Sequence, residues 1–219
     1  MAEALHLQHM VSRARTLGAD AAAPLPAQAV VVDERVSLKC RVPLCGHYGV
    51  NLMCPPYVPT PAETREALRR YSDTLVVQQD IPLTRAAVDG VVAAATEPGS
   101  GGAEPGAGGA PATAGEPPAT VDEGLLRDSQ NRFAELMSAL EAEAYRMGYR
   151  FAAAFAGGDC VLCDVCAGVT GGQCKRPGEA RPSMEAVGID VVATAQAAGL
   201  KLEVPAGDSP RWTGLLLID

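Results

Sequence analysis

Seven cysteines lie in two short stretches of this 219-residue chain, and any fold it adopts must place both stretches in loops that keep the thiols together. Isolated cysteines are usually small buried hydrophobic residues. These recur instead beside many glycines, which suit a ligand-holding loop better than a core. An odd number of cysteines in a chain expected to be cytoplasmic also argues against a disulfide framework. We therefore predict that all seven are metal ligands: Cys40, Cys45, Cys54, Cys160, Cys163, Cys166 and Cys174.

The downstream stretch, CVLCDVCAGVTGGQCKRP at residues 160–177, has the spacing Cys-x2-Cys-x2-Cys-x7-Cys-x2-Pro. It approaches the bacterial ferredoxin run, Cys-x2-Cys-x2-Cys-x3-Cys-Pro, although its last gap is longer and its proline comes later. Structural zinc sites also use pairs of cysteines separated by two residues, so zinc is the alternative metal. Three cysteines at consecutive steps of this kind favour a [4Fe-4S] cluster over the paired layout typical of zinc.

The upstream stretch, KCRVPLCGHYGVNLMCPP at residues 39–56, supplies three cysteines, one short of the set for a four-iron cluster. The fourth ligand then comes from elsewhere, or one iron stays open. Candidate ligands are His47, Asp159 and Asp164, or a cysteine exchanged between the two loops. For His47, an ordinary loop histidine is the simpler interpretation. The chain is thus predicted to hold one or two [4Fe-4S] clusters, with zinc as the alternative.

A segment rich in glycine and proline divides the chain. Twelve of the 25 residues at 97–121 are Gly or Pro, and none is Leu, Lys, Arg or aromatic, which predicts a disordered linker. It separates a first half, 1–96, with the three-cysteine loop, from a second half, 122–219, with the four-cysteine loop. We expect the two halves to form one compact domain overall.

The two halves show the same order of predicted elements. The first reads as a helix ending near residue 18, a strand at 27–32, the cysteine loop, a helix at 60–71 capped by Thr60, and a strand at 74–78. The second reads as a helix at 128–147, a strand at 150–155, the cysteine loop, a helix at 183–199, and strands at 201–204 and 214–218. The predicted fold is α/β (an α+β sandwich), with two similar helix–strand–Cys loop–helix–strand halves around a shared mixed sheet. A coincidence of common α/β units is the alternative.

Charge and composition argue against nucleic acid and membranes as partners. A net charge of −8, a pI near 4.9 and few aromatic residues argue against nucleic acid, which needs a basic face and stacking platforms. No apolar run approaches the roughly 18–20 residues that cross a bilayer, so no membrane association is expected. The first residues mix His, Glu and Arg into apolar positions, unlike a signal peptide. We predict a cytoplasmic protein.

Both stretches, LKCRVPLCGHYGVNLMCPPYVPTP and CVLCDVCAGVTGGQCKRPGEARPSMEAVGIDV, resemble a cysteine-rich family of predicted metal-binding proteins of unknown function. The resemblance covers almost the whole chain apart from the linker. Its motifs are YG at 48–49, CPP at 54–56, RPSMEA at 181–186 and GID at 188–190. The resemblance implies metal binding through all seven cysteines, iron–sulfur chemistry and no established reaction. For Asp190 we expect a structural ion pair with Arg176 or Arg181.

Three functions are compatible with these features. The first is a [4Fe-4S] protein in electron transfer, or an accessory factor, with a redox or metalloenzyme partner protein. The second is an enzyme that binds its substrate at an open iron of the three-cysteine site, near Tyr48, Asn51 and His47. The third is a binding module in which zinc stabilises the fold without catalysing a reaction. The residues do not decide whether the chain is an enzyme, because no known catalytic constellation is recognisable.

Overall fold

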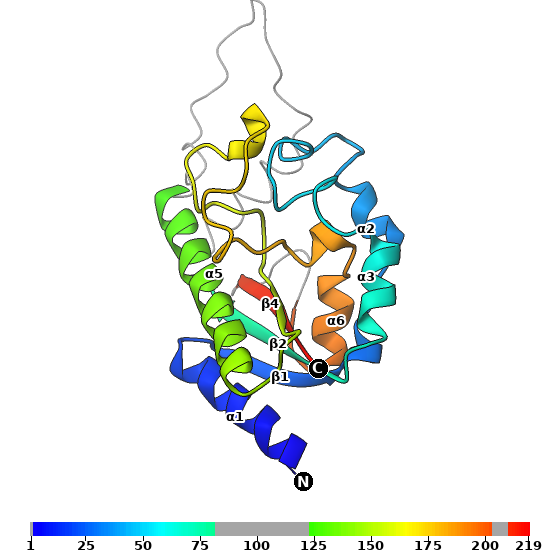
Figure 1. The fold of residues 1–219 in the computed structure, drawn as a ribbon, viewed down its shortest axis with the longest axis vertical. Coiled ribbons are helices and arrows are strands. Elements are labelled where there is room, and N and C mark those ends of the chain that lie inside the picture. Colours follow the sequence, from blue (N-terminus) through cyan, green and yellow to red (C-terminus); the bar gives the residue numbers. More distant parts are fainter. Residues whose placement is uncertain (1, 82–122, 203–209) are drawn as a thin grey trace, which may run out of the picture.

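The computed structural model describes residues 2–81, 123–202 and 210–219 (Figure 1). The predicted linker at 97–121 lies outside the described residues, as does part of the strand predicted at 201–204. The helices are α1 (Ala2–Thr16), α2 (Glu34–Leu38), α3 (Pro61–Leu68), α5 (Glu123–Arg146) and α6 (Val191–Ala197). The strands are β1 (Ala21–Pro26), β2 (Asp73–Asp80), β3 (Ala153–Phe155) and β4 (Arg211–Ile218). Short 3-10 turns are η1 (Ala27–Ala29), η2 (Ala167–Thr170) and η3 (Glu185–Val187).

Both halves contribute two strands to one sheet, in the order β1-β2-β4-β3. The central pair runs antiparallel from Asp73 opposite Ile218 to Asp80 opposite Arg211. Each edge strand is the first strand of its half, and each central strand is the second. The shared sheet is therefore confirmed, but the prediction that it is mixed was wrong, because every pair of named strands is antiparallel. Superposition of the two halves stays a prediction.

The sheet lies between two layers of helices, as Figure 1 shows. Successive residues of a strand point to opposite faces, so Leu75 and Val77 pack with α1 and α5, whereas Val76 packs with α3 and η3. All three side chains are fully buried. The strands are apolar on both faces because both are covered. This arrangement confirms the predicted α+β sandwich.

Local sequence explains the helices that were predicted correctly. Helix α5 buries a stripe spaced by three or four residues: Phe133, Leu136, Met137, Leu140 and Ala144. Helix α3 begins with Pro61 in its first turn, after a capping box in which Thr60 accepts from the Glu63 amide and the Glu63 carboxylate accepts from the Thr60 amide. The order helix, strand, cysteine loop, helix, strand occurs in both halves as expected.

Three predicted segments were wrong. The strand expected at 27–32 is replaced by β1, Ala21–Pro26, whose two prolines are tolerated because β1 is an edge strand. The strand expected at 150–155 forms only at Ala153–Phe155. The helix expected at 183–199 is split into η3 and α6, because Gly188 ends η3 in a left-handed conformation with φ of 82°. In addition, 201–202 are not part of a strand.

Gly188 offers a sharp test of this packing. A Cβ there would lie 2.5 Å from Cγ of Pro61, at the start of α3, and the positive φ already disfavours any other residue. We expect Gly188→Ala to lower the free energy of unfolding by roughly 3 kcal/mol or more. Gly199→Ala is the matched control, because Gly199 also has a positive φ but has open space around its Cβ position. Gly199→Ala should lower the free energy of unfolding by about 1–2 kcal/mol, with both variants measured by urea titration. Equal losses would contradict the packing of η3 on α3.

Candidate metal centre

The two cysteine loops lie side by side at one end of the molecule, beyond the sheet and opposite α1 (Figure 1). They touch at Gly168, where an added Cβ would lie only 2.4 Å from the carbonyl oxygen of Val50. A residue with a side chain would therefore separate the loops. In the described part of the chain, no helix is long and apolar enough to cross a membrane.

All four thiols of the downstream loop line one small cavity of about 20 Å³. Its lining includes Cys160, Cys163, Cys166 and Cys174. Three consecutive residues of the upstream loop, 51–53, form another part of the wall. The four cysteines predicted from their spacing to share one site thus line one cavity, and metal coordination by them stays a prediction.

Asn51 and Leu52 bind the upstream loop to this cavity. The Leu52 amide donates to the sulfur of Cys166 at 3.5 Å. The Asn51 side-chain nitrogen donates to the Cys160 carbonyl at 3.1 Å, and its oxygen accepts from the Met53 amide at 3.0 Å. Asn51 is only 4% exposed, so both of its hydrogen bonds replace bonds to water. The upstream loop is therefore a structural part of the downstream site.

The four downstream thiols also influence one another electrostatically. Burial raises the pKa of Cys160, a hydrogen bond from the Leu162 amide lowers it, and the nearby Cys174, Cys163 and Cys166 raise it further. A group of neighbouring thiols cannot all ionise without positive charge to compensate. A bound metal ion supplies that charge and removes the thiol protons outright.

The three upstream thiols form a second group. Burial raises the pKa of Cys54 to about 12, and the charges of Asp159, Cys45, Cys40 and Cys160 raise it as well. Cys54 is 8% exposed, and its thiol is within electrostatic reach of the upstream cysteines and of Cys160 in the downstream loop. The two predicted sites are adjacent rather than independent.

Cys40 completes this group, and its thiol also senses the charge of Glu185. Burial raises the pKa of the Cys40 thiol, Cys45 and Glu185 raise it further, and Arg41 lowers it. The three upstream cysteines are therefore within electrostatic reach of one another. Glu185 was not among the residues proposed from the sequence, although it lies within the RPSMEA motif.

Each of the seven cysteines is a free thiol. Among the described residues, no three His, Cys, Asp or Glu side chains approach closely enough to hold a single metal ion. Four cysteine thiolates can hold either a single zinc ion or a four-iron cluster, in which each thiolate binds a different iron. The chemistry of the donor set, four thiols around one cavity, fits such a cluster.

The side chains predicted as extra ligands have different positions. The Nδ1 atom of His47 forms an ion pair with Asp159 at 3.5 Å, which joins the two loops across their contact. Asp164 is 94% exposed and pairs with Arg127 at 2.8 Å. Asp164 therefore lies at the surface, whereas His47 and Asp159 border the site. None of these contacts tests metal coordination.

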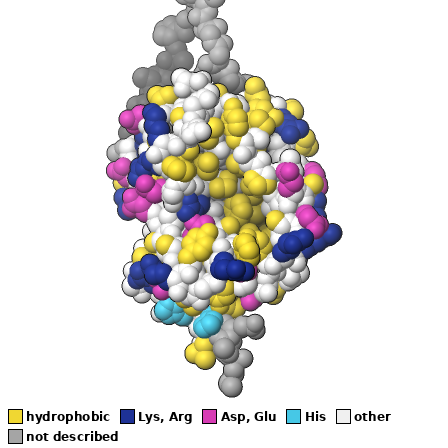
Figure 2. All heavy atoms as spheres, in the orientation of Figure 1, with side chains coloured by type: hydrophobic (Ala, Val, Ile, Leu, Met, Phe, Trp, Pro, Cys, Tyr) yellow, Lys and Arg dark blue, Asp and Glu magenta, His cyan; other side chains and the backbone are white. Residues whose placement is uncertain are grey.

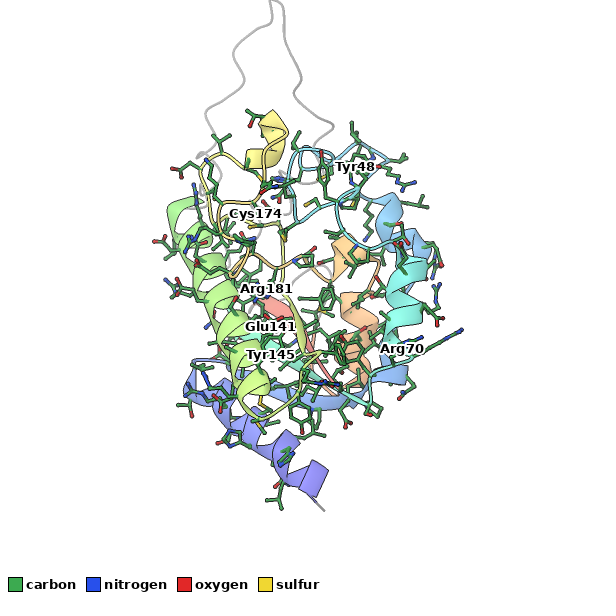
Figure 3. All side chains as sticks on the ribbon, viewed as in Figure 1. Tyr48, Arg70, Glu141, Tyr145, Cys174 and Arg181 are labelled. Atoms are coloured by element: carbon green, nitrogen blue, oxygen red, sulfur yellow. The ribbon has the colours of Figure 1, made fainter. Side chains whose placement is uncertain are left out.

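Two arginines stabilise the downstream loop through hydrogen bonds and ion pairs. Arg176 donates to the Leu162 carbonyl at 3.2 Å and pairs with Glu179. Arg181 pairs with Glu141 of α5 through two of its nitrogens, one of them at 2.7 Å. Figure 3 shows Arg181 and Glu141 next to one another, below the loop that carries Cys174. Glu141 follows Met137 by four residues, so a charged residue on the buried stripe of α5 is the sequence signal for this ion pair.

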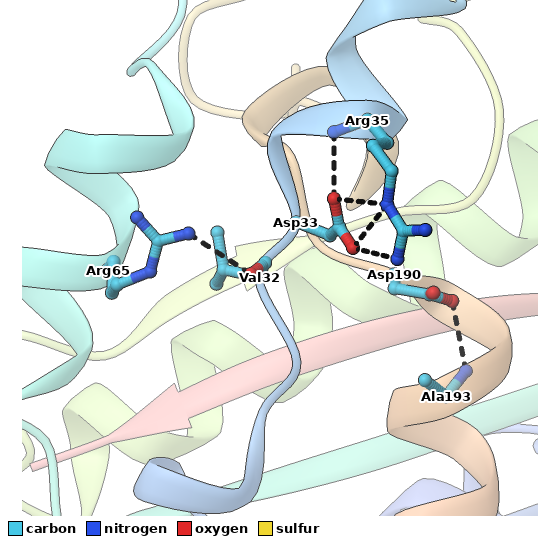
Figure 4. Close-up of polar contacts among 6 residues, drawn as sticks. All are labelled: Val32, Asp33, Arg35, Arg65, Asp190 and Ala193. Carbon is cyan, nitrogen blue, oxygen red and sulfur yellow. Dashed lines mark hydrogen bonds and ion pairs between the residues drawn. The ribbon is translucent and has the colours of Figure 1, made fainter.

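The ion pair expected for Asp190 was wrong. Its carboxylate accepts from the Ala193 amide at 3.0 Å and caps α6, as Figure 4 shows. An aspartate directly before a short helix satisfies an amide that the helix leaves unpaired. Asp33 caps α2 in the same way and binds Arg35, so both caps stabilise the segments that lead into and out of the loops.

One family model matches most of the chain. The family model described as "Predicted metal-binding protein (DUF2284)" matches residues 23–218, which include all seven cysteines. No curated protein and no solved structure matches the chain. The resemblance inferred from the two cysteine stretches is thereby confirmed, and it extends over both halves. The chain belongs to the family of predicted metal-binding proteins of unknown function, DUF2284.

Proposed function

We propose that the protein binds a [4Fe-4S] cluster at each cysteine loop and acts in electron transfer, or as an accessory factor to a metalloenzyme. The observation that carries this proposal is the cavity lined by Cys160, Cys163, Cys166 and Cys174. Four thiolates around one enclosed space form the usual ligand set of a four-iron cluster. The upstream loop would hold the second cluster through its three cysteines.

The surroundings of the thiols suit a negatively charged cluster. The amides of Leu52 and Leu162 donate to cysteine sulfurs, and such hydrogen bonds adjust the reduction potential of a cluster. Arg176 and Arg127 bind carbonyls of the downstream loop and bring positive charge near it. These groups stabilise a reduced cluster relative to an environment without donors.

The position of Cys54 supports passage of electrons between the two sites. Cys54 belongs to the upstream group, yet the charge of Cys160 affects it. The Leu52 amide, two residues before Cys54, donates to Cys166. Bonded and hydrogen-bonded atoms therefore connect the two loops directly. Two clusters held this way would form a short relay.

The loop end of the molecule also suits docking of a protein partner. Five exposed valine and leucine residues lie on the two loops: Val42, Leu44, Val50, Val165 and Val169. Figure 2 shows hydrophobic side chains across the upper end of the molecule, where the loops lie. Apolar surface gathered at one place marks an interaction site. A redox partner bound there would reach the clusters by the shortest route.

A second candidate function is catalysis at an iron without a cysteine ligand. It is favoured by an open cavity of about 430 Å³ whose lining includes His47, Asn51, Asp159 and Cys160. A small molecule with a carboxylate or sulfur group would fit such a space, with His47 and Asn51 as polar contacts. A zinc-stabilised binding module remains the third proposal, and it predicts no redox activity.

Reversible reduction tests the electron-transfer role. We expect the anaerobically purified protein to absorb broadly at about 400 nm, to bleach on addition of dithionite and to regain its colour when an oxidised acceptor protein is added. The reduced protein should give an electron paramagnetic resonance (EPR) signal. Apo-protein prepared with a chelator is the control. A protein whose spectrum does not respond to reductant would contradict electron transfer and would favour the zinc module.

A further inference from the structure

A short turn of the upstream loop, residues 47–54, connects the two cysteine loops. The Asn51 amide donates to the His47 carbonyl at 3.0 Å, and the Asn51 carbonyl accepts from the Cys54 amide at 2.9 Å. The backbone of Asn51 is therefore held on both sides, and one of the two partners is a predicted metal ligand. Because a hydrogen bond joins them, the position of Asn51 depends on that of Cys54.

Two groups of this turn reach the downstream loop. The Asn51 side-chain nitrogen donates to the Cys160 carbonyl at 3.1 Å, and the Leu52 amide donates to Sγ of Cys166 at 3.5 Å. Both cysteines line the cavity of the four thiols. Asn51 is only 4% exposed, so without this bond its side chain would keep a buried donor with no partner, which is unfavourable. The side chain of Asn51 thus helps to fix the direction of the Leu52 amide.

Gly168 of the downstream loop allows the two loops to approach this closely. A Cβ at this position would lie 2.4 Å from the carbonyl oxygen of Val50 and 3.1 Å from Cγ of Leu52. The backbone of Gly168 does not have a positive φ. The close approach of the upstream loop, rather than the backbone conformation, is therefore what requires glycine there.

We propose that the upstream loop sets the reduction potential of the downstream cluster, with Asn51 as the positioning residue that holds the Leu52 amide on Cys166. The inference rests on the proposed iron–sulfur function and deepens it. A donor to a cysteine sulfur stabilises the more negative, reduced cluster and so raises its reduction potential. Because Cys54 holds Asn51 in place, loss of metal from the upstream loop should lower the downstream potential.

Gly168→Ala and Gly172→Ala form a matched pair, because each adds one methyl group to the same loop. At Gly172 the nearest atom to an added Cβ is the Ala167 carbonyl oxygen at 3.4 Å, an ordinary contact within the loop. Gly168→Ala should separate the loops and lower the ratio of reduced to oxidised downstream cluster at the wild-type midpoint potential. A loss of about three- to tenfold corresponds to the net strength of one hydrogen bond. Tenfold is about 59 mV for a one-electron couple. Gly172→Ala should leave the ratio unchanged in the same EPR-monitored redox titration.

Asn51→Ala tests the positioning residue without adding volume, and it should lower the same ratio. A second measurement needs no metal: hydrogen exchange of the Leu52 amide in the metal-free protein. Exchange should be faster by about tenfold or more in Asn51→Ala and Gly168→Ala, and unchanged in Gly172→Ala. A purely structural role would instead speed exchange throughout the molecule, through a general loss of stability. Such a general change without a specific one at Leu52 would contradict the positioning role.

Cys45→Ala tests the dependence on the upstream site, because it removes an upstream thiol and leaves the turn and the downstream thiols intact. The downstream cluster of this variant should show the same lowered ratio. Adding Asn51→Ala to Cys45→Ala should change the ratio little further, since both act through the Leu52 amide. Shifts that simply add would mean that the two substitutions act independently, and would overturn the coupling.

The possible outcomes separate the two levels of the proposal. A wild-type protein without a reducible cluster overturns the proposed function and the coupling together. A protein with both clusters, whose downstream potential is the same in wild type, Gly168→Ala and Asn51→Ala, overturns the coupling alone. Equal shifts in Gly168→Ala and Gly172→Ala also overturn it, because contact between the loops would not be the cause. Circular dichroism shows whether each variant is folded, and Asn51→Ala decides the question if Gly168→Ala is not.

Discussion

Cys163→Ala is expected to remove about half of the bound iron, and Cys45→Ala the other half, because each substitution disrupts a different cluster. Cys163 lines the downstream cavity, whereas Cys45 belongs to the upstream group around Cys54. Each substitution removes one of the thiolates that its loop uses to hold a cluster, so we expect most of the iron at the altered loop to be lost. The measurement is iron and sulfide per chain after anaerobic reconstitution, combined with the EPR spectrum of the reduced protein.

The two variants serve as controls for one another, since both remove one sulfur from a loop at the same end of the molecule. The double variant should retain almost no iron. A result in which either single substitution removes all of the iron from a folded protein would contradict two separate centres. It would indicate one centre that draws ligands from both loops.

The second large effect concerns the ion pair between Glu141 and Arg181. Their side chains are only 10% and 15% exposed, and Glu141 also accepts from the Ala154 amide at 3.3 Å. Glu141→Ala would leave the guanidinium buried without its partner, so we expect a loss of about 3–5 kcal/mol in the free energy of unfolding. Because Arg181 follows the downstream loop, the variant should also lose its downstream iron faster.

A surface pair provides the control. Glu66 pairs with Arg69 at 3.0 Å, and both side chains are more than half exposed. Glu66→Ala should cost less than about 1 kcal/mol. The double variant Glu141→Leu with Arg181→Met removes both charges and should be considerably more stable than Glu141→Ala alone. Urea titrations of the metal-free proteins measure the free energy of unfolding of the wild type, the two single variants and the double variant. If Glu141→Ala lowers the free energy of unfolding no more than Glu66→Ala does, the buried ion pair does not stabilise the loop.

Local patterns in the sequence predicted those elements whose causes are local. The stripe from Phe133 to Ala144 identified α5, and the Thr60 capping box identified the start of α3. The cysteine spacing identified a group of four thiols that the structure places around one cavity. The repeated order of elements also followed from periodicity alone. Each of these features depends on residues within one short segment of the chain.

The features that the sequence did not predict depend on distant contacts. Strand β1 contains Pro24 and Pro26, and only its position at the sheet edge makes them acceptable. The break at Gly188 is enforced by Pro61, more than a hundred residues earlier. The direction of the strands depends on how the halves meet at β2 and β4.

The most direct test of the central claim, that the seven thiols hold two iron–sulfur clusters, is the metal and sulfide content of the wild-type protein isolated without oxygen. We expect a brown protein with about eight irons and about eight inorganic sulfides per chain, and with little zinc. A colourless protein with zinc and no sulfide, or with no metal and seven thiols open to alkylation, would contradict the claim.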